Sequence, residues 1–537
     1  MSQVDVIGIS GDRVCIDEAK ILETMLKVRY EHAKNTSKDY SHLFRTKTKW
    51  ELLRMTAIFF GNQLAVAAET TFASPILRRT GLSYTFTTMA WAIAPVLGFF
   101  LIPCIATLSD QNRLSWGRRK PIMLASGIGL MVGLLMLPYG KTLGLLIGDA
   151  NVPVSEMTGF RWSILLTIIG LVLIDFNAET ANAIGRTYCM DMCLEDDHSK
   201  ALTVAVMIGG VGSMAGYLLG SIDWSTLNLR NIFESNEATV FATVFVLFFL
   251  FMLVTLTSFR EVPLAAIEKD HLLRPISRTT LQRELSQSQK VYTLEKIENG
   301  RSEKSGEDLS FKRLLENIVR MPKALRRLYF TQFMLNLALL SFTINFTHFV
   351  GDEIFNGDVS AAEGSLELEK YNEGIRFGSL GLAFLVLVSS VFSIIIGALL
   401  KFIKAKYFLI GALLLNSIGM LMMTFVKKRY MIFVGCTTAG IYYAAIFSIP
   451  FILLAHYHTI NSFERADGKL VPNKQKRGLG TDVSILSSMF YLALLIVSLA
   501  LGSLVDYFGT SSVALYSASL FSCLAAISAS RLIYLDL

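Results

Sequence analysis

One pattern recurs along most of this chain: stretches of about 20 mostly apolar residues, long enough for a helix to cross the hydrocarbon core of a bilayer. Twelve such stretches can be counted, six before a long polar segment and six after it. Because 53% of the 537 residues are hydrophobic and only 17% are charged, most of this apolar surface must face lipid rather than water. The sequence therefore predicts an all-α, multi-pass membrane protein with twelve transmembrane helices.

Polar segments divide the chain into four parts. Residues 1–50 are polar and mixed in charge, and residues 51–259 contain the first six apolar stretches. Residues 260–326 form a central loop rich in Ser, Lys, Glu and Gln, a composition typical of disorder. Residues 327–537 contain the last six stretches. By this count the expected architecture is two six-helix bundles, the arrangement of the major facilitator fold.

The distribution of Lys and Arg predicts the orientation in the membrane. Basic residues gather at 45–54, 113–120, 401–406 and 469–477, which all lie on one side if the N-terminus is inside. The opposite side holds fewer, although residues 427–429 depart from the rule. Since cytoplasmic loops carry an excess of Lys and Arg, both termini are predicted to be cytoplasmic. These loops account for the net charge of +7, and no nucleic-acid partner is expected.

The fourth apolar stretch carries the most informative polar residues. Four of them recur at steps of four, three and four and so share one helical face: Asp175, Glu179, Asn182 and Arg186. An ionised side chain at the bilayer centre costs about 2.5–3.5 kcal/mol, so residues of this kind usually line a path through the protein. We predict that Asp175 carries a proton and that Glu179 shares this role. A structural ion pair between helices is the alternative.

Polar and aromatic residues on other stretches are candidates for the same path. Asn62 and Glu69 are seven residues apart on the first stretch, and Glu69 is predicted to be a further proton-coupling carboxylate. Amides and hydroxyls suit a hydroxyl-rich solute, and aromatic rings can stack on the apolar face of a sugar. The predicted substrate-binding residues are Asn62, Asn182, Gln332, Asn336, Thr343, Tyr442 and Tyr443. Joining or packing of helices is the alternative for each.

The loop between the second and third stretches combines one acidic residue with a basic run. Gly117 permits a tight turn before Arg118, Arg119 and Lys120, and Asp110 can pair with these cations. We predict a gating loop, in which this charge pairing holds one access state of a transporter. A role in setting the membrane topology alone is the alternative.

These residues resemble solute carrier family 45 of the major facilitator superfamily, the animal relatives of plant sucrose–proton symporters. Matching blocks are spread over about residues 50–530, and include 69–77, 91–99, 109–121, 175–179, 216–224, 371–379 and 478–482. In that family a fourth-helix Asp, here Asp175, is implicated in proton coupling. His348 and Asp352 depart from the pattern, since the family more often has Asp and Gln there. The resemblance implies proton-coupled symport of sucrose, glucose or a related neutral sugar by alternating access.

Other functions stay open at this stage. One is proton-coupled transport of a different small organic solute in an organelle membrane, and another is a non-transporting sensor on the same fold. An anionic substrate would need an Arg or Lys in the outer or middle part of the helices, where none is found, which favours a neutral solute. No phosphate loop, metal-ligand cluster or nucleophile motif occurs, so we expect neither an enzyme nor a cofactor nor a metal site.

The expected partners are a sugar, protons and the lipid bilayer. We expect a monomer. Members of the family occur at the cell surface and in melanosomal or lysosomal membranes. For this chain we expect the plasma membrane rather than a lysosome-related or other organelle membrane.

The orientation makes a testable prediction for the glycosylation sequon Asn35-Thr36-Ser37. With a cytoplasmic N-terminus this sequon does not meet the lumenal glycosylation machinery, so Asn35 is expected to carry no glycan. Gel mobility before and after N-glycosidase treatment, together with mass spectrometry of the peptide, measures this. A glycan on Asn35 would place the N-terminus outside and overturn the predicted orientation.

Overall fold

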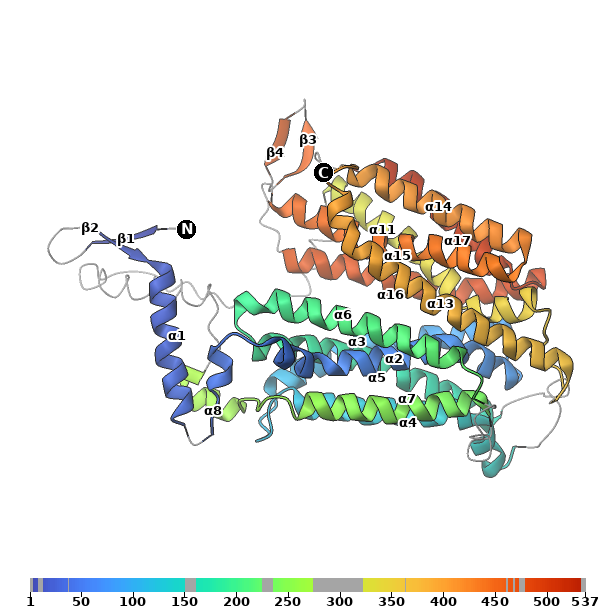
Figure 1. The fold of residues 1–537 in the computed structure, drawn as a ribbon, viewed down its shortest axis with the longest axis horizontal. Coiled ribbons are helices and arrows are strands. Elements are labelled where there is room, and N and C mark those ends of the chain that lie inside the picture. The colour runs from blue at the N-terminus through green and yellow to red at the C-terminus, as the bar shows by residue number, and fades with distance from the viewer. Residues whose placement is uncertain are drawn as a thin grey trace.

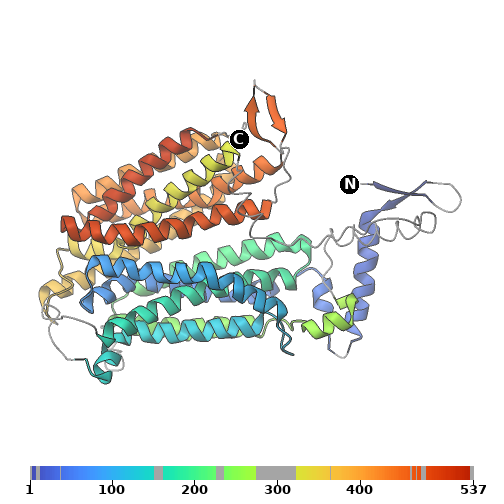
Figure 2. The same ribbon diagram turned by 180° about the vertical axis from the view of Figure 1, so that it is seen from behind.

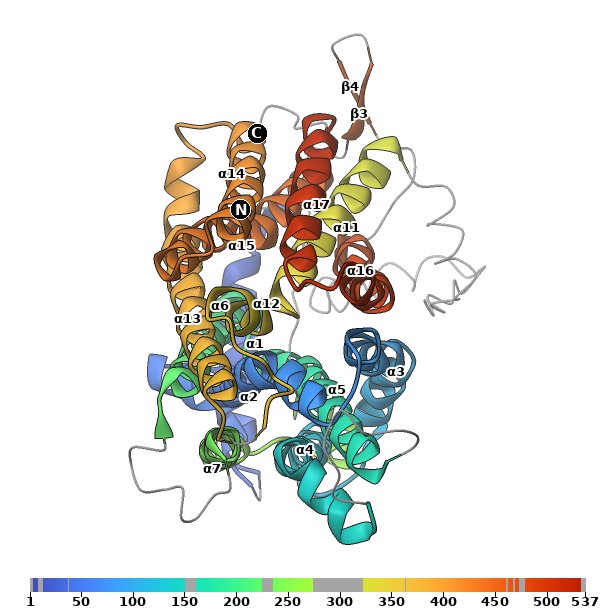
Figure 3. The same ribbon diagram turned by 90° about the vertical axis from the view of Figure 1, so that its right-hand side faces the viewer.

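The computed structural model describes residues 3–7, 13–36, 38–149, 161–224, 235–273, 322–362, 364–459, 462–466, 469–472 and 479–532. Within these ranges the chain is mostly helical, with two short antiparallel strand pairs. The long helices form two groups, one from each half of the sequence (Figure 1). Seen end-on, the helices of the C-terminal half lie in one group above those of the N-terminal half (Figure 3).

Six long helices make up the N-terminal group: α2 (Lys49–Arg79), α3 (Tyr84–Gln111), α4 (Lys120–Ile147), α5 (Trp162–Met192), α6 (Glu195–Ser221) and α7 (Asn236–Leu256). α2 lies at the centre of this group, packed against α5, α6 and α7. Its start is fixed by a capping box, in which Thr48 and Glu51 each accept a hydrogen bond from the other's backbone N–H.

The C-terminal group begins with α11 (Lys323–Thr343), which continues through a 44° bend into α12 (Phe346–Phe349) and the π-turn η6 (Val350–Ile354). Five long helices follow: α13 (Leu366–Leu399), α14 (Ala405–Val426), α15 (Arg429–Thr459), α16 (Leu479–Phe508) and α17 (Val513–Ser530). Figure 2 shows both groups from behind, with α16 and α17 on the near side of the C-terminal group.

α4 and α5 pack closely because small residues bring their backbones together. A Cβ added at Gly170 of α5 would lie 2.6 Å from the backbone nitrogen of Leu137, and one added at Gly140 of α4 would collide with Thr167. Small residues serve this purpose in membrane proteins, where burial of apolar surface does not drive helices together. The close packing holds α5, which carries Asp175 and Glu179, firmly within the N-terminal group.

Of the helices described, ten are long and apolar enough to cross a membrane, and the bent segment from α11 to η6 makes eleven. The long helix outside this set is α2, whose middle contains Asn62, Gln63, Glu69 and Thr70. Because α5, α6 and α7 pack around it, these polar residues need not face lipid. The predicted all-α fold with two six-helix groups is confirmed, and the exact assignment of twelve transmembrane helices stays a prediction.

The N-terminal segment has secondary structure that the sequence did not indicate. It contains a strand pair, β1 (Gln3–Ile7) and β2 (Arg13–Asp17), then α1 (Glu18–Lys34) and the short helix η1 (Ser41–Phe44). A second strand pair, β3 (Ser462–Ala466) and β4 (Lys469–Pro472), follows α15.

The segment predicted as a disordered central loop is ordered at its start. Residues after α7 form α8 (Leu264–Lys269) and η5 (His271–Leu273), and α1 packs against η5. His32 of α1 lies 2.6 Å from a carboxylate oxygen of Asp270. Residues 274–321 lie outside the described residues, and the last residues of the predicted loop, 323–326, belong to α11 instead.

An aromatic contact also fastens η1 to the end of α7. The His42 ring stacks on Phe259 with 5.1 Å between centroids, and the Lys47 ammonium lies 4.5 Å from the centre of the same Phe259 ring. Burial, reinforced by the charge of Lys47, lowers the pKa of His42 to about 4. The folded protein therefore holds a neutral imidazole at this position at neutral pH.

This contact predicts a pH dependence of stability. An unfolded His has a pKa of about 6.5, so as the pH falls the unfolded chain takes up the proton first. The stabilisation from His42 is full above about pH 6.5 and is lost as the pH falls toward the folded-state pKa of about 4. Melting temperatures of the purified protein and of His42→Gln should therefore differ in their pH slope over this window. An identical slope in both proteins would contradict the prediction.

Candidate transport site

Three carboxyl groups come together between α2 and α5. Glu69 is 1% exposed, and its Oε1 has no hydrogen-bond partner in the described structure. Asp175 and Glu179 lie one turn apart near the middle of α5 and are half-buried. Glu69 interacts electrostatically with both of them. The structure thus places the three predicted proton-coupling residues in one cluster, although Glu69 is far from the other two in sequence.

A pair of amides joins α2 to α5 beside this cluster. Asn62 Nδ2 donates to Asn182 Oδ1 at 3.1 Å and lies 3.5 Å from the carbonyl oxygen of Ala178. Both side chains are buried, and Asn62 Oδ1 has no hydrogen-bond partner among the residues described. The two predicted substrate-binding amides of this half therefore bind each other and leave one acceptor available.

Tyr491 brings the C-terminal half to the same cluster. This α16 residue donates from its hydroxyl to Glu179 Oε2 at 3.4 Å, and its hydroxyl also interacts electrostatically with Asp175 and Arg186. Arg186 itself is exposed and interacts electrostatically with Glu179. Sequence reasoning missed Tyr491 because it follows Met489 and Phe490 in an apolar run that looks like ordinary packing.

No hydrogen bond joins the predicted binding residues of α11 to this cluster in the described structure. Gln332 and Asn336, one turn apart, are 2% and 1% exposed. Gln332 Oε1 and both polar side-chain atoms of Asn336 have no hydrogen-bond partner in the described part of the chain. Thr343 donates back to the carbonyl oxygen of Leu339 at 3.1 Å. Since buried polar groups are nearly always satisfied, the two amides are candidates for binding a solute or water.

The two predicted aromatic residues of α15 differ in their surroundings. Tyr442 is buried, and its hydroxyl donates to the carbonyl oxygen of Leu335, which joins α15 to α11. The Tyr443 ring lies 4.7 Å from that of Phe447, and its hydroxyl interacts electrostatically with Tyr217 of α6. Tyr443 is therefore the one of the pair that lies near the other half, while the hydroxyl of Tyr442 is occupied by the backbone.

The predicted gating loop forms ion pairs within the N-terminal half. Arg119 lies 2.5 Å from Asp110 Oδ1 and 3.0 Å from Asp191 Oδ2 of α5, and Arg118 lies 3.1 Å from the same Asp191 oxygen. Lys120 donates to the carbonyl oxygen of Leu256 at the end of α7, at 2.7 Å. These contacts fasten the loop to α5 and α7. Control of access by the loop stays a prediction, because each of these partners belongs to the same half.

Glu261, which follows α7, holds this loop in place, and no sequence pattern indicated this contact. Its carboxylate accepts hydrogen bonds from the backbone N–H groups of Arg119 at 2.8 Å and Lys120 at 3.1 Å. Gly117 has a φ of +129° and packs directly against the same carboxylate. Burial raises the pKa of Glu261, and these backbone N–H groups oppose that shift. The sequence alone could not predict this contact, because about 140 residues separate Glu261 from the loop.

Contacts between the halves gather where α2 ends and α3 begins. Thr71 and Ser379 hydroxyls lie 3.2 Å apart, and Ser379 also donates to the carbonyl oxygen of Tyr217 at 2.7 Å. Ser74 donates to the carbonyl oxygen of Ile344 at 3.0 Å. In the predicted orientation this end faces outward.

An aromatic cluster lies at this outer end. The His348 ring of α12 hydrogen-bonds the hydroxyls of both Tyr84 and Tyr371, and Arg78 lies 4.0 Å from the centre of the Tyr84 ring. Asp506 of α16 accepts from the backbone N–H of Tyr84 at 3.2 Å. His348, one of the two residues that depart from the family pattern, is therefore a contact between the halves.

Asp352, the other departure, contacts the segment that leads into α17 instead. It accepts a hydrogen bond from Ser511 at 2.8 Å, just before α17 begins. Asp352 thus joins two elements of the C-terminal half.

The many long apolar helices make this an integral, multi-pass membrane protein. Two groups of such helices around a polar cluster are the architecture of a membrane transporter. Residues 143–462 match the Major Facilitator Superfamily, and residues 12–271 match the family described as Sugar (and other) transporter. The chain therefore belongs to the Major Facilitator Superfamily.

Its relatives are members of solute carrier family 45, which confirms the resemblance seen in the sequence. The chain is 29% identical to the human Membrane-associated transporter protein, over 87% of this chain and 90% of that protein. It is 24% identical to the human Proton-associated sugar transporter A, over 90% and 86%. It is 28% identical to the mouse Solute carrier family 45 member 3, over 78% and 72%.

Solved structures share the fold. A bacterial homolog of the human lysosomal transporter Spinster, inward-facing and unoccupied, matches with a TM-score of 0.57 and 14% identity, over 91% of this chain and 99% of that one. The inward-open xylose transporter XylE from E. coli matches with a TM-score of 0.52 and 14% identity, over 90% and 95%. At these identities the likeness shows the fold alone.

The Gly117 contact predicts a difference between two glycines. Gly117 and Gly148 have similar φ angles of +129° and +132°, but a Cβ meets nothing within 4 Å at Gly148 and collides with Glu261 at Gly117. Both positions have a positive φ that disfavours alanine, and only Gly117 adds a collision with Glu261. We expect Gly117→Ala to be less stable than Gly148→Ala by about 1–3 kcal/mol, the usual cost of overpacking. Thermal unfolding in detergent measures this, and equal melting temperatures would refute it.

Proposed function

We propose that this protein is a secondary active transporter that moves a neutral sugar together with protons by alternating access. Sucrose, glucose and related sugars are the candidate substrates. In this proposal residues 51–259 and 327–537 are the two moving halves, and both termini are cytoplasmic. The protein works as a monomer in the plasma membrane.

The main support for this proposal is the carboxyl cluster of Glu69, Asp175 and Glu179. Carboxylates held close together in a low-dielectric interior repel one another when ionised, so a bound proton relieves that repulsion. The Tyr491–Glu179 hydrogen bond crosses between the halves, which connects this cluster to their relative position. Asp175 is the proposed proton carrier, with Glu179 and Glu69 sharing the charge.

The arrangement of the halves supports alternating access. Polar contacts close the outer end, as in the Thr71–Ser379 and Tyr84–His348 pairs. The two groups of helices diverge toward the opposite end, where the N-terminal segment lies (Figure 1). The proposed state is therefore inward-facing, and opening of the outer end would require these contacts to break.

The residues available for a solute favour a neutral, hydroxyl-rich molecule. Buried polar atoms of Asn62, Gln332 and Asn336 lack hydrogen-bond partners in the described structure, and amides can both donate to and accept from hydroxyl groups. One relative is named Proton-associated sugar transporter A, which supports a sugar and a proton as the transported pair.

The available energy is sufficient for concentrative uptake. A proton moving down a potential of about 100 mV releases about 2.3 kcal/mol. A gradient of one pH unit adds about 1.4 kcal/mol. Coupling to a single proton can therefore sustain a solute gradient on the order of several hundredfold.

Uptake of labelled sucrose and glucose tests the proposal in yeast that lack their own sugar uptake. We expect uptake to be faster at acidic pH and to be abolished by a protonophore. Asp175→Asn should abolish uphill uptake while surface expression is kept, because the neutral amide cannot carry a proton. Glu69→Gln and Tyr491→Phe should weaken coupling or affinity. Glu369→Gln, an exposed residue at the start of α13, is the matched control and should behave as the parent.

Exchange of labelled for unlabelled sugar separates coupling from binding. Exchange needs no net proton movement, so Asp175→Asn should retain it while losing pH-driven uptake. If Asp175→Asn still accumulates sugar as the parent does, Asp175 is structural. If the parent, correctly placed in the membrane, moves no sugar, the substrate is a different small organic solute and the same variants would be tested with a wider panel.

A further inference from the structure

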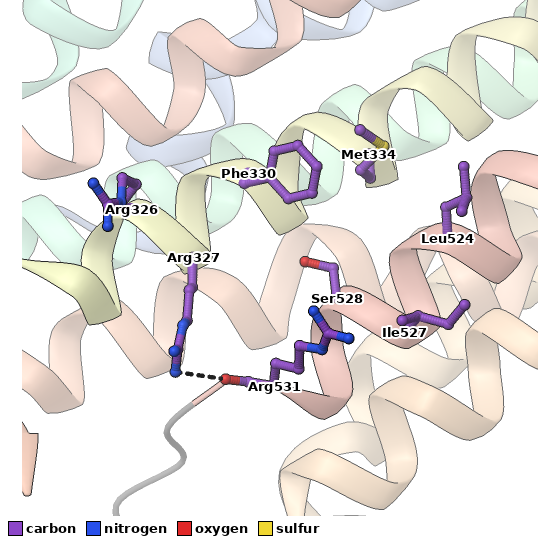
Figure 4. Close-up of a pocket in the computed structure, with 8 residues that line it drawn as sticks. All are labelled: Arg326, Arg327, Phe330, Met334, Leu524, Ile527, Ser528 and Arg531. Carbon is purple, nitrogen blue, oxygen red and sulfur yellow. Dashed lines mark hydrogen bonds between the residues drawn. The ribbon is translucent and has the colours of Figure 1, made fainter.

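A cavity of about 470 Å³ opens where the start of α11 meets the end of α17. Three exposed arginines line it: Arg326 and Arg327 from α11 and Arg531 from the C-cap of α17. Figure 4 shows the arginines at one end of the pocket and apolar side chains further along the two helices. This pocket is separate from the carboxyl cluster of α2 and α5.

The charge of the pocket is not balanced within the described part of the chain. No carboxylate there forms an ion pair with any of the three guanidinium groups, and Arg327 donates to the carbonyl oxygen of Arg531 at 3.4 Å. The first turn of α11 contains no acidic residue, and no side chain caps the helix. Arg326 and Arg327 therefore add their charges to the positive end of the helix dipole, an arrangement that attracts an anion.

The remaining wall is apolar and open to the surroundings. Phe330, Leu524 and Ile527 line the pocket and are 53%, 41% and 55% exposed. Phe330 lies one turn of α11 beyond Arg326, so the apolar wall begins within about 6 Å of the cationic end along the helix axis. On a membrane protein such exposed side chains face lipid tails.

We propose that this pocket binds an anionic phospholipid of the cytoplasmic leaflet, with the phosphate on the three arginines and an acyl chain along the apolar wall. Two features select this occupant. A cationic end beside an apolar wall complements a molecule that has both an anionic head and a hydrocarbon tail. The pocket also lies at the end of the helices that the distribution of Lys and Arg predicts as cytoplasmic, where anionic lipids are concentrated.

Binding of phosphatidylserine to the purified full-length protein tests the proposal. Lipid retention is measured by native mass spectrometry, and the melting temperature is followed as phosphatidylserine is titrated into phosphatidylcholine–detergent micelles. Removing three near-surface cations should weaken binding on the order of 100-fold. The triple variant Arg326→Gln/Arg327→Gln/Arg531→Gln removes these cations and is compared with the parent protein. The matched control removes two lysines of the α13–α14 connection and one from the first turn of α14, as Lys401→Gln/Lys404→Gln/Lys406→Gln, and should bind as the parent does.

Two further experiments distinguish binding of a lipid from binding of a free anion. Leu524→Asn/Ile527→Asn keeps the arginines and alters only exposed positions, so it should fold and yet bind phosphatidylserine more weakly. Inorganic phosphate alone should stabilise the parent far less than phosphatidylserine does. The proposal fails if the arginine variant binds phosphatidylserine as the parent does, or if the lysine control loses as much. It also fails if inorganic phosphate stabilises the protein equally well.

Discussion

The cost of holding carboxylates away from water shapes the N-terminal half. Glu69 lies on α2, and the surrounding helices α5, α6 and α7 keep this polar helix away from lipid. Asp175 and Glu179 reach the same place from α5, which glycine contacts hold tightly against α4. An apolar bundle thus surrounds one buried and two half-buried carboxyl groups. Ionisable residues within membrane helices usually serve a function or pair with one another.

Two kinds of polar contact have different consequences for movement. Those around Glu261, Arg119 and Asp191 lie within one half and join its elements to one another. Those of Tyr84 with His348, and of Tyr491 with Glu179, cross between the halves. Rocking of one half against the other would leave the first kind intact and break or remake the second. In the proposed cycle, protonation at the carboxyl cluster and closure of the outer end are therefore linked through a few side chains.

The membrane surface of the protein carries a separate feature. The arginine pocket between α11 and α17 lies on the C-terminal half, and it is lined by exposed apolar side chains that belong in lipid. A lipid bound there would contact only the C-terminal half among the elements that line the pocket. In the proposed transport cycle such a lipid would therefore bind one of the two helical groups and not the other.

The sequence by itself determined the membrane class, the two-half architecture and the polar face of α5, because these depend on local composition and on helical periodicity. It also singled out Glu69, since a carboxylate in an apolar stretch is conspicuous wherever it occurs. Only the tertiary structure decided that Glu69 lies within electrostatic range of Asp175, that Tyr491 hydrogen-bonds Glu179 and that Glu261 holds the loop at Gly117. Partners of this kind are separated by 100 residues or more, and their contact depends on how whole helices pack.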